Sequence, residues 1–398
     1  MTNEPQRGFT HEEIKRRWGT LQQSMQASGI DALLLTTEPD VRYVSGFLTP
    51  FWQSPTRTWS IVLPAIGDPI AVIATIGEPL MKATPIKQIV AYASPHPTKD
   101  ARETLRQVLQ QLISDNTSSS KPFTLGVPMG AETTVRMPLG DWQWIQSQLP
   151  AAHFKDATAV IQSAQRIKSA QEVNIIRYVA HCVSKVFAEL PNVLRPGMTE
   201  QDVFRIFKQM ALGAGVDSVD YLVGGADIDG YRDIIGPPSC RPLTNGDVLI
   251  LDTGCTRDGY HCDFDRNYSV GAPSKRVAHA HHVAWDATEA GLEQLRPGVT
   301  CQQVFQVMHS VMQPHSSESA GADVGRLGHG LGMQLTETPS FTAFDQTILE
   351  SGMVLTLEPG YCYGEGQIMV HEENVLITES GYELLSTRAP RDIMSIPA

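Results

Sequence analysis

Hydrophobic residues recur three or four positions apart near the start of the chain, at Ile14, Trp18, Leu21 and Met25. This spacing predicts an amphipathic helix, which Gly29 can end. Short apolar runs then predict buried strands at 31–37, 59–64, 70–75 and 88–93. The more polar segment 99–114 predicts a further helix. Strands that alternate with helices indicate an α/β domain, for which we expect the bounds 1–160.

The remainder, residues 161–398, is expected to form a second domain that contains an internal repeat. It opens with a predicted helix from Lys168. Residues 194–204 then match residues 295–305 at an offset of 101, and both segments place a threonine where a helix can begin. Residues 246–254 match residues 352–360 at an offset of 106. The near-equal offsets predict a duplicated helix-and-strand module with pseudo-twofold symmetry and a site between the two copies.

Composition excludes several classes of protein. The net charge of −12 argues against nucleic acid as a partner. The chain has no apolar run long enough to cross a membrane, and its polar N-terminus has no secretory h-region. None of the six cysteines forms a CxxC pair, so we expect reduced thiols and no cysteine zinc site. Together these features predict a cytoplasmic protein with no membrane partner.

Candidate chemistry lies in acidic residues at equivalent positions of the repeat. Asp252 and Glu358 are each expected to end an apolar strand, and each precedes a glycine by two residues. Asp263 and Glu372 come 11 and 14 residues later, where a returning strand can bring each beside its partner. Four converging carboxylates repel one another unless cations neutralise them. The alternative, scattered surface charges, does not explain the repeat symmetry.

A fifth candidate is His329, which glycines flank in Gly328-His-Gly-Leu-Gly332. Carboxylates and one imidazole form a hard, oxygen-rich set that favours two divalent ions, foremost manganese, with iron, cobalt or zinc also open. Such a pair suits hydrolysis through a metal-bridged hydroxide.

The motifs Asp252-x-Gly, Asp263, Gly328-His329-Gly-x-Gly, Glu358-Pro-Gly and Glu372 together resemble those of the creatinase, aminopeptidase P and prolidase family of "pita-bread" metallohydrolases. The resemblance covers the whole chain. It implies a creatinase-like N-terminal α/β domain and a C-terminal pita-bread domain, an α/β (α+β) chain in all.

By the same resemblance, five residues hold two divalent metal ions per subunit, and Glu358 also serves as the catalytic base. Those residues are Asp252, Asp263, His329, Glu358 and Glu372. The family's last ligand lies six residues before a threonine, which selects Glu372 from Thr378, although Glu373 stays open as an alternative.

Several positions depart from the family pattern. Ile235 and Thr336 stand where proline-peptide cleaving relatives carry two substrate-handling histidines, and Val370 stands where an arginine is frequent. Asp265 replaces a usual threonine or serine. It is expected either to orient a ligand or cationic substrate, or to form a salt bridge with Arg266 or another arginine.

In the first domain, the loop 51–57 combines aromatic residues with an arginine. Family members are typically homodimers in which the N-terminal domain of one subunit overhangs the site of the other. We therefore expect Trp52 and Arg57 to reach the partner's site and contact substrate. The alternative is a loop that packs on its own domain.

The sequence thus predicts a dinuclear metal-dependent hydrolase of a small molecule or dipeptide, similar to Xaa-Pro dipeptidases and aminopeptidases. A second hypothesis is a non-peptidase member, such as a creatinase-like or ectoine-hydrolase-like C–N hydrolase or a dimethylsulfoniopropionate-type lyase. A third, from another class, is an inactive metal-binding pseudoenzyme.

Overall fold

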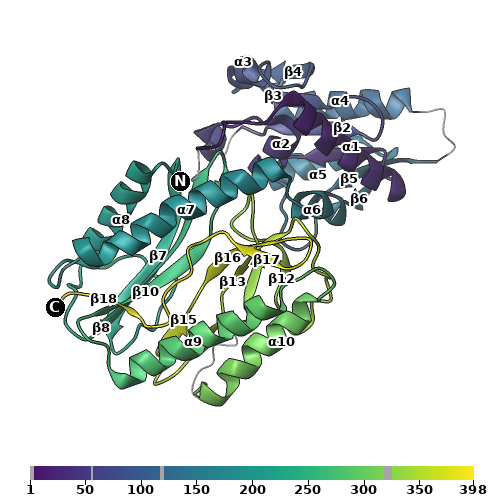
Figure 1. Ribbon diagram of the computed structural model, residues 1–398. Helices are drawn as coiled ribbons and strands as arrows, with labels where there is room; N and C mark the ends of the chain where they lie inside the picture. Colours follow the sequence, from purple (N-terminus) through teal and green to yellow (C-terminus); the bar gives the residue numbers. More distant parts are fainter. Residues whose placement is uncertain (1–3, 55–56, 117–120, 318–324) are drawn as a thin grey trace. The chain divides into compact units, whose positions relative to one another are not determined.

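The computed structural model describes residues 4–54, 57–116, 121–317 and 325–398 (Figure 1). Contacts divide the chain into two compact units, residues 7–165 and residues 1–6 with 166–398. The division falls at Gln165–Arg166, a few residues beyond the boundary expected at 160. All six cysteines are free thiols, and only Cys240 is exposed. Among the described residues, no helix is long and apolar enough to span a lipid bilayer.

The first unit is built on a six-stranded mixed sheet in the order β4-β3-β2-β1-β5-β6. Its strands are β1 (Ala32–Leu35), β2 (Ser60–Pro64), β3 (Ile70–Ala74), β4 (Gln88–Tyr92), β5 (Phe123–Val127) and β6 (Ala152–Asp156). Its α-helices are α1 (His11–Ala27), α2 (Glu38–Ser45), α3 (Glu78–Met81), α4 (Ala101–Asp115), α5 (Leu139–Gln148) and α6 (Thr158–Arg166). Short 3-10 turns cover η1 (Pro50–Gln53) and η2 (Thr75–Gly77).

Helix α1 forms where the hydrophobic spacing predicts it. Its four periodic residues are all buried, the hydroxyl of Thr10 accepts a hydrogen bond from the Glu13 amide, and the chain turns away at Gly29 with a φ of 64°. Leu105 and Leu109 of α4 pack with Leu34 and Val72 of the sheet. The four predicted strands and both predicted helices of this unit are therefore present.

The second unit holds two five-stranded sheets, each covered by a pair of helices (Figure 1). One sheet has the order β18-β10-β8-β7, with β9 paired to β8, and the other has the order β12-β11-β13-β16-β17. The helices are α7 (Ala170–Val193), α8 (Glu200–Ala214), α9 (Lys275–Gln294) and α10 (Cys301–Met312), followed by the 3-10 turn η3 (Gln313–His315).

The strands of the first sheet are β7 (Ser218–Ile228), β8 (Asp247–Arg257), β9 (Tyr260–His261), β10 (Phe264–Val270) and β18 (Met394–Ile396). Those of the second are β11 (Gly328–Gly330), β12 (Glu337–Ser340), β13 (Val354–Leu357), β16 (Glu373–Ile377) and β17 (Tyr382–Leu384). A separate hairpin pairs β14 (Gly360–Cys362) with β15 (Ile368–Val370).

The internal repeat is visible in this order of elements. Two helices and three paired strands, α7-α8-β7-β8-β10, recur as α9-α10-β11-β13-β16. Thr199 and Thr300 begin the equivalent helices α8 and α10 with the same reciprocal capping box, in which the side chains at the cap and three residues later each accept from the other's backbone amide.

The start of the second unit is tied to its second sheet. Ile167 forms an isolated β-bridge with Met353, and the ammonium of Lys168 lies 2.7 Å from Glu337 Oε2. Both side chains of this ion pair are buried, with exposed fractions of 2% and 7%. A buried pair of this kind depends on both partners, because either charge alone would be left without compensation.

Candidate metal centre

Both sheets of the second unit contribute acidic residues to one site. Asp252 lies in the middle of β8, and Asp263 directly precedes β10, which returns antiparallel to β8. The expectation that Asp252 ends its strand is wrong, because β8 continues to Arg257 through its pairing with β7 and β9. Glu358 does follow the last residue of β13, as expected.

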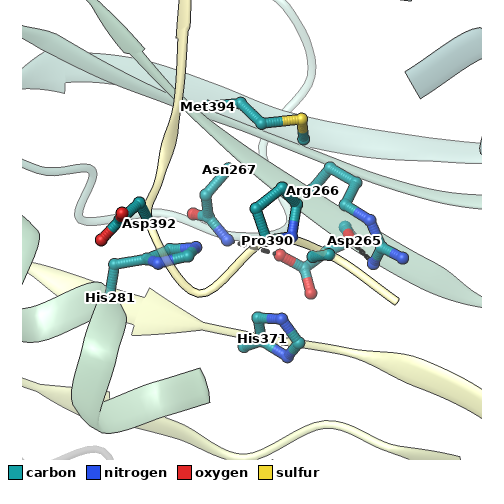
Figure 2. Close-up of a pocket in the computed structure, with 9 residues that line it drawn as sticks. Asp265, Arg266, Asn267, His281, His371, Pro390, Asp392 and Met394 are labelled. Carbon is teal, nitrogen blue, oxygen red and sulfur yellow. Dashed lines mark hydrogen bonds between the residues drawn. The ribbon is translucent and has the colours of Figure 1, made fainter. Parts of the chain in front are cut away.

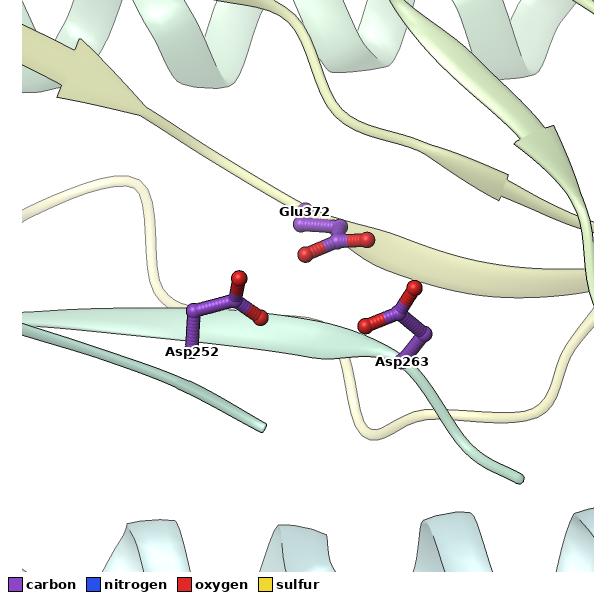
Figure 3. A group of neighbouring side chains, drawn as sticks. All are labelled: Asp252, Asp263 and Glu372. Carbon is purple, nitrogen blue, oxygen red and sulfur yellow. The ribbon is translucent and has the colours of Figure 1, made fainter. Parts of the chain in front are cut away.

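Asp252, Asp263 and Glu372 place one carboxylate oxygen each within 4.8 Å of the others (Figure 3). Asp263 and Glu372 are buried, whereas Asp252 is half-buried. The Oδ1 atom of Asp252 has no hydrogen-bond partner among the described residues. Three close carboxylates with an unpartnered buried oxygen fit a divalent cation, because a cation supplies the compensation that the protein does not.

His329 and Glu358 extend this group of acids. His329 Nε2 lies 3.4 Å from Asp263 Oδ2 and 3.8 Å from Glu358 Oε1. The other ring nitrogen, Nδ1, lies 2.8 Å from the backbone oxygen of Gly330, which assigns the proton to Nδ1 and leaves Nε2 as a free ligand atom. The structure therefore brings together all five residues that the sequence nominates.

A glycine is required next to this histidine. Gly328 has a φ of 140°, and a Cβ there would lie 2.2 Å from the backbone oxygen of Thr356. The close approach of β11 to β13 thus depends on the absence of a side chain, and it carries His329 to the acids.

Burial governs the protonation of the carboxylates before a metal binds. It raises the pKa of Asp252 to about 7, against a hydrogen bond from Tyr221 that favours the charged form. It also raises the pKa of Glu358 to about 7, which the nearby Arg326 opposes. A carboxyl with a pKa near neutrality is suited to accept and return a proton at physiological pH.

Burial also favours the neutral form of the remaining members. Burial, followed by the charge of Asp252, raises the pKa of Asp263 well above its usual value. Burial and then the charge of Asp263 do the same for Glu372. Burial lowers the pKa of the His329 imidazole to about 4, so this ring is neutral at pH 7 and able to act as a ligand.

The adjacent residues Glu372 and Glu373 have different partners, which indicate different roles. Thr356 Oγ1 donates a 2.5 Å hydrogen bond to Glu372 Oε1, which orients that carboxylate toward the acids. Glu373 instead lies 2.9 Å from Arg266 and 3.3 Å from Arg388, and it is fully buried between them. The geometry supports Glu372 as the ligand, because the charge of Glu373 is already compensated.

Asp265 lies directly across from Asp252 in the β8–β10 register and lines a small cavity with His281 and His371 (Figure 2). Its Oδ2 accepts a 2.7 Å hydrogen bond from Asn267, while Oδ1 has no partner among the described residues. Arg266 donates to the backbone oxygen of Asp265 rather than to its carboxylate. No salt bridge to Asp265 is thus found within the described part of the chain.

The predicted substrate positions lie in different surroundings. Ile235 is 72% exposed. Thr336 is half-buried, and its hydroxyl lies 3.4 Å from Arg326 Nη2. In the first unit, Trp52 is buried with its ring centroid 5.7 Å from that of Trp59.

Arg57 is half-exposed, and its guanidinium lies 4.8 Å from the centre of the Phe51 ring. Residues 55 and 56 of the same loop lie outside the described residues. Within the first unit, Trp52 thus packs on its own domain, while Arg57 keeps part of its surface in solvent.

Four side chains that contact the site were not predicted from the sequence, among them Tyr221, which forms a hydrogen bond with Asp252. Thr356 orients Glu372, as described above. Asn374 Oδ1 accepts a 2.9 Å hydrogen bond from the Asp263 amide and so fixes the backbone before β10. Arg326 Nε lies 3.6 Å from Glu358 Oε1. Only Arg326 has a local signal, since it precedes His329 by three residues.

Comparisons with known proteins agree with this arrangement. The model of metallopeptidase family M24 matches residues 174–379, and that of the creatinase/prolidase N-terminal domain matches residues 17–167. A probable dipeptidase, PepE, of Mycobacterium tuberculosis is 28% identical over 401 residues, which cover 98% of this chain and 99% of that relative.

Solved structures give the same picture. Dipeptidase PepE from Mycobacterium ulcerans superposes with a TM-score of 0.83 at 25% identity, over 98% of this chain and 100% of that one. A prolidase from Thermococcus sibiricus superposes with a TM-score of 0.84 at 22% identity, over 96% and 99% of the two chains, and shows the same fold.

Proposed function

The chain belongs to metallopeptidase family M24, and from this premise we propose that it is a dipeptidase that uses two divalent metal ions. Family membership confirms the family resemblance and the fold class predicted from the sequence, a creatinase-like N-terminal domain followed by a pita-bread domain. It also implies a hydrolase that works with divalent metal ions. The substrate and the metal are proposed from the residues of the site.

The observation that carries the proposal is the group of acids Asp252, Asp263 and Glu372, together with His329 and Glu358. These five residues are the proposed ligands, and manganese is the metal that their oxygen-rich set favours. When bound, such ions lower the pKa of water and polarise a carbonyl group. Glu358 would move the proton, because its carboxylate lies beside His329 in this group and is 24% exposed to an incoming molecule.

The proposed substrates are dipeptides, as the similarity to the PepE dipeptidases suggests. Residues 235 and 336 carry no imidazole in this chain. Removing one hydrogen bond to a transition state typically costs about 10²–10³ in rate. We therefore expect slow turnover of Xaa-Pro dipeptides.

A second candidate function is hydrolysis of a C–N bond in a small non-peptide molecule. The absence of histidine at residues 235 and 336 favours it, because the family resemblance assigns substrate-handling histidines to these positions in relatives that cleave proline peptides. Creatine-like and cyclic amidine compounds are the substrates to test for this candidate.

We further propose a cytoplasmic homodimer in which the loop 51–57 of one subunit contacts the site of the other. The half-exposed Arg57 would bind substrate in trans, and Trp52, packed against Trp59, would support the loop rather than touch substrate. We propose that each subunit of this dimer consists of two domains, residues 1–160 and residues 161–398.

The experiment is metal analysis of the purified protein, followed by a panel of dipeptides with and without a second-position proline and of the non-peptide compounds. We expect two equivalents of metal per chain and release of free amino acids from the dipeptides. The Asp263→Asn variant should lose metal and activity while its circular dichroism spectrum is unchanged. A wild-type protein that binds no metal, or an Asp263→Asn variant that keeps two equivalents and full activity, would refute the proposal.

A further inference from the structure

Arg326 lies at the edge of the proposed metal centre. Its Nε atom lies 3.6 Å from Glu358 Oε1, and Nη2 lies 3.4 Å from Thr336 Oγ1. About a third of the side chain, 34%, is exposed, and Glu358 is 24% exposed beside it. The guanidinium is therefore held near the reacting groups while part of it remains accessible to an incoming molecule.

No second arginine is available in the same way among the described residues. Arg266 also approaches the centre, but it is 4% exposed and its Nη atoms donate to Glu373 and to the backbone oxygens of Asp265, Glu372 and Thr387. Its hydrogen-bonding capacity is directed into the protein interior.

The contacts of Arg326 use less of the hydrogen-bonding capacity of its guanidinium than those of Arg266 do. At 3.6 Å and 3.4 Å, both are longer than an ordinary charge-assisted hydrogen bond of about 2.7–2.9 Å. A guanidinium has five N–H donors in a planar fork that matches two oxygens of one anion. The structure thus presents a permanent cation with donors to spare, at the accessible side of Glu358.

The other groups of the centre cannot do this work. Four are carboxylates, and the fifth, His329, is itself a proposed metal ligand whose Nδ1 lies 2.8 Å from the backbone oxygen of Gly330. An anionic group of a substrate would be repelled by the carboxylates wherever the metal ions do not screen them. Arg326 is the side chain of the site that can attract such a group directly.

We propose that Arg326 binds the negatively charged oxygens that a substrate presents beside the scissile bond. The inference rests on the proposed function and deepens it, because it restricts good substrates to molecules that carry or develop an anion at that position. Two sources share this chemistry: the C-terminal carboxylate of a dipeptide and the oxyanion that forms on the attacked carbonyl group.

The experiment compares the metal-loaded wild-type protein with Arg326→Gln and Arg326→Lys. Arg205→Gln is the matched control, because Arg205 is an exposed arginine on α8 whose salt bridge is to Asp202 on the same helix. Calorimetry measures the affinity for three non-hydrolysable ligands: a reduced-amide dipeptide with a free carboxylate, the same compound as a C-terminal amide, and a phosphinic dipeptide analogue as its C-terminal amide. Metal content is measured on every variant.

If the source is the carboxylate, Arg326→Gln should bind the free acid about ten- to a hundredfold more weakly while the affinity for its amide changes less than threefold. If the source is the oxyanion, the phosphinic amide should lose affinity by a similar factor while the reduced amide does not. In either case Arg326→Lys should recover part of the loss, and Arg205→Gln should match the wild type.

An equal loss for all three ligands, or a loss of bound metal, would overturn the inference, since Arg326 would then act only by positioning Glu358. Unchanged affinities in Arg326→Gln would overturn it as well. Failure of the proposed function is a separate result, in which the wild-type protein itself binds no metal or none of the three dipeptide analogues.

Discussion

Neutralising a proposed metal ligand should stabilise the metal-free protein. Burial raises the pKa of Asp252 from an ordinary 3.8 to about 7. Between these two values, the folded protein retains a proton that the unfolded chain has released, so the stability of the metal-free fold falls as the pH rises from 4 to 7. Asp252→Asn removes this penalty because asparagine carries no charge.

The magnitude follows from the shift of about three pKa units. At 1.36 kcal/mol per unit, the charged carboxylate costs about 4 kcal/mol at pH 8. Because Asp252 is half-buried, solvent screening reduces this to about 2 kcal/mol. At pH 5 much of the penalty is absent, so the advantage of Asp252→Asn should shrink by about half or more.

Glu373→Gln is the matched control with the opposite sign. Glu373 is also a buried carboxylate, but it pairs with Arg266 and Arg388. Removing one partner of a buried ion pair costs about 3–5 kcal/mol, so this variant should be less stable than the wild type at both pH values. The two substitutions therefore distinguish Asp252, whose charge no basic side chain among the described residues compensates, from Glu373, whose charge two arginines compensate.

The assay is urea unfolding in the presence of a chelator at pH 5 and pH 8, with circular dichroism as the signal that monitors unfolding. Saturating manganese should reverse the order at pH 8, because the wild type gains stability from metal binding and Asp252→Asn gains less. An Asp252→Asn variant that is destabilised at pH 8 as strongly as Glu373→Gln would refute the view that the buried charge of Asp252 lacks compensation in the metal-free protein.

Three further predictions concern other parts of the chain. Thr356→Val should weaken metal binding about 10–100-fold in a chelator competition assay, because it removes the hydrogen bond that orients Glu372, while Thr356→Ser should not. Lys168→Met should lower the free energy of unfolding by about 3 kcal/mol, as measured with urea, and the double variant that also replaces Glu337 by Gln should recover part of the loss. An inactive Arg57→Ala protein mixed with an inactive metal-site variant should regain about a quarter of the wild-type activity per site after subunit exchange, and a mixture that stays inactive would place the loop in cis.

Local patterns in the sequence were sufficient to predict much of the structure of the second unit. The offsets of 101 and 106 identify the repeat, and the threonines at 199 and 300 begin equivalent helices as predicted. The five nominated residues converge because duplication places acids at equivalent points of two sheets. The internal repeat therefore predicts that these distant residues lie close together, which the pattern of any one strand does not.

Other features depend on contacts between distant segments, which no local pattern records. The apolar run before Asp252 suggests that the strand ends there, yet pairing with β7 and β9 carries β8 five residues further. The contact of Arg326 with Glu358 joins residues 32 positions apart. The aromatic residues of the loop 51–57 looked suited to cover a substrate, but Trp52 is also able to fill a gap beside Trp59.

The division of the proposed ligands between two sheets has a consequence for how the protein matures. Asp252 and Asp263 belong to the first half of the repeat, whereas His329, Glu358 and Glu372 belong to the second. Neither half holds the complete set, so all five proposed ligands come together only after the two halves have folded and packed against each other. If these residues bind the metal as proposed, metal uptake is a late event in biogenesis, and a chain interrupted between β10 and α9 would leave the ribosome without three of the five proposed ligands.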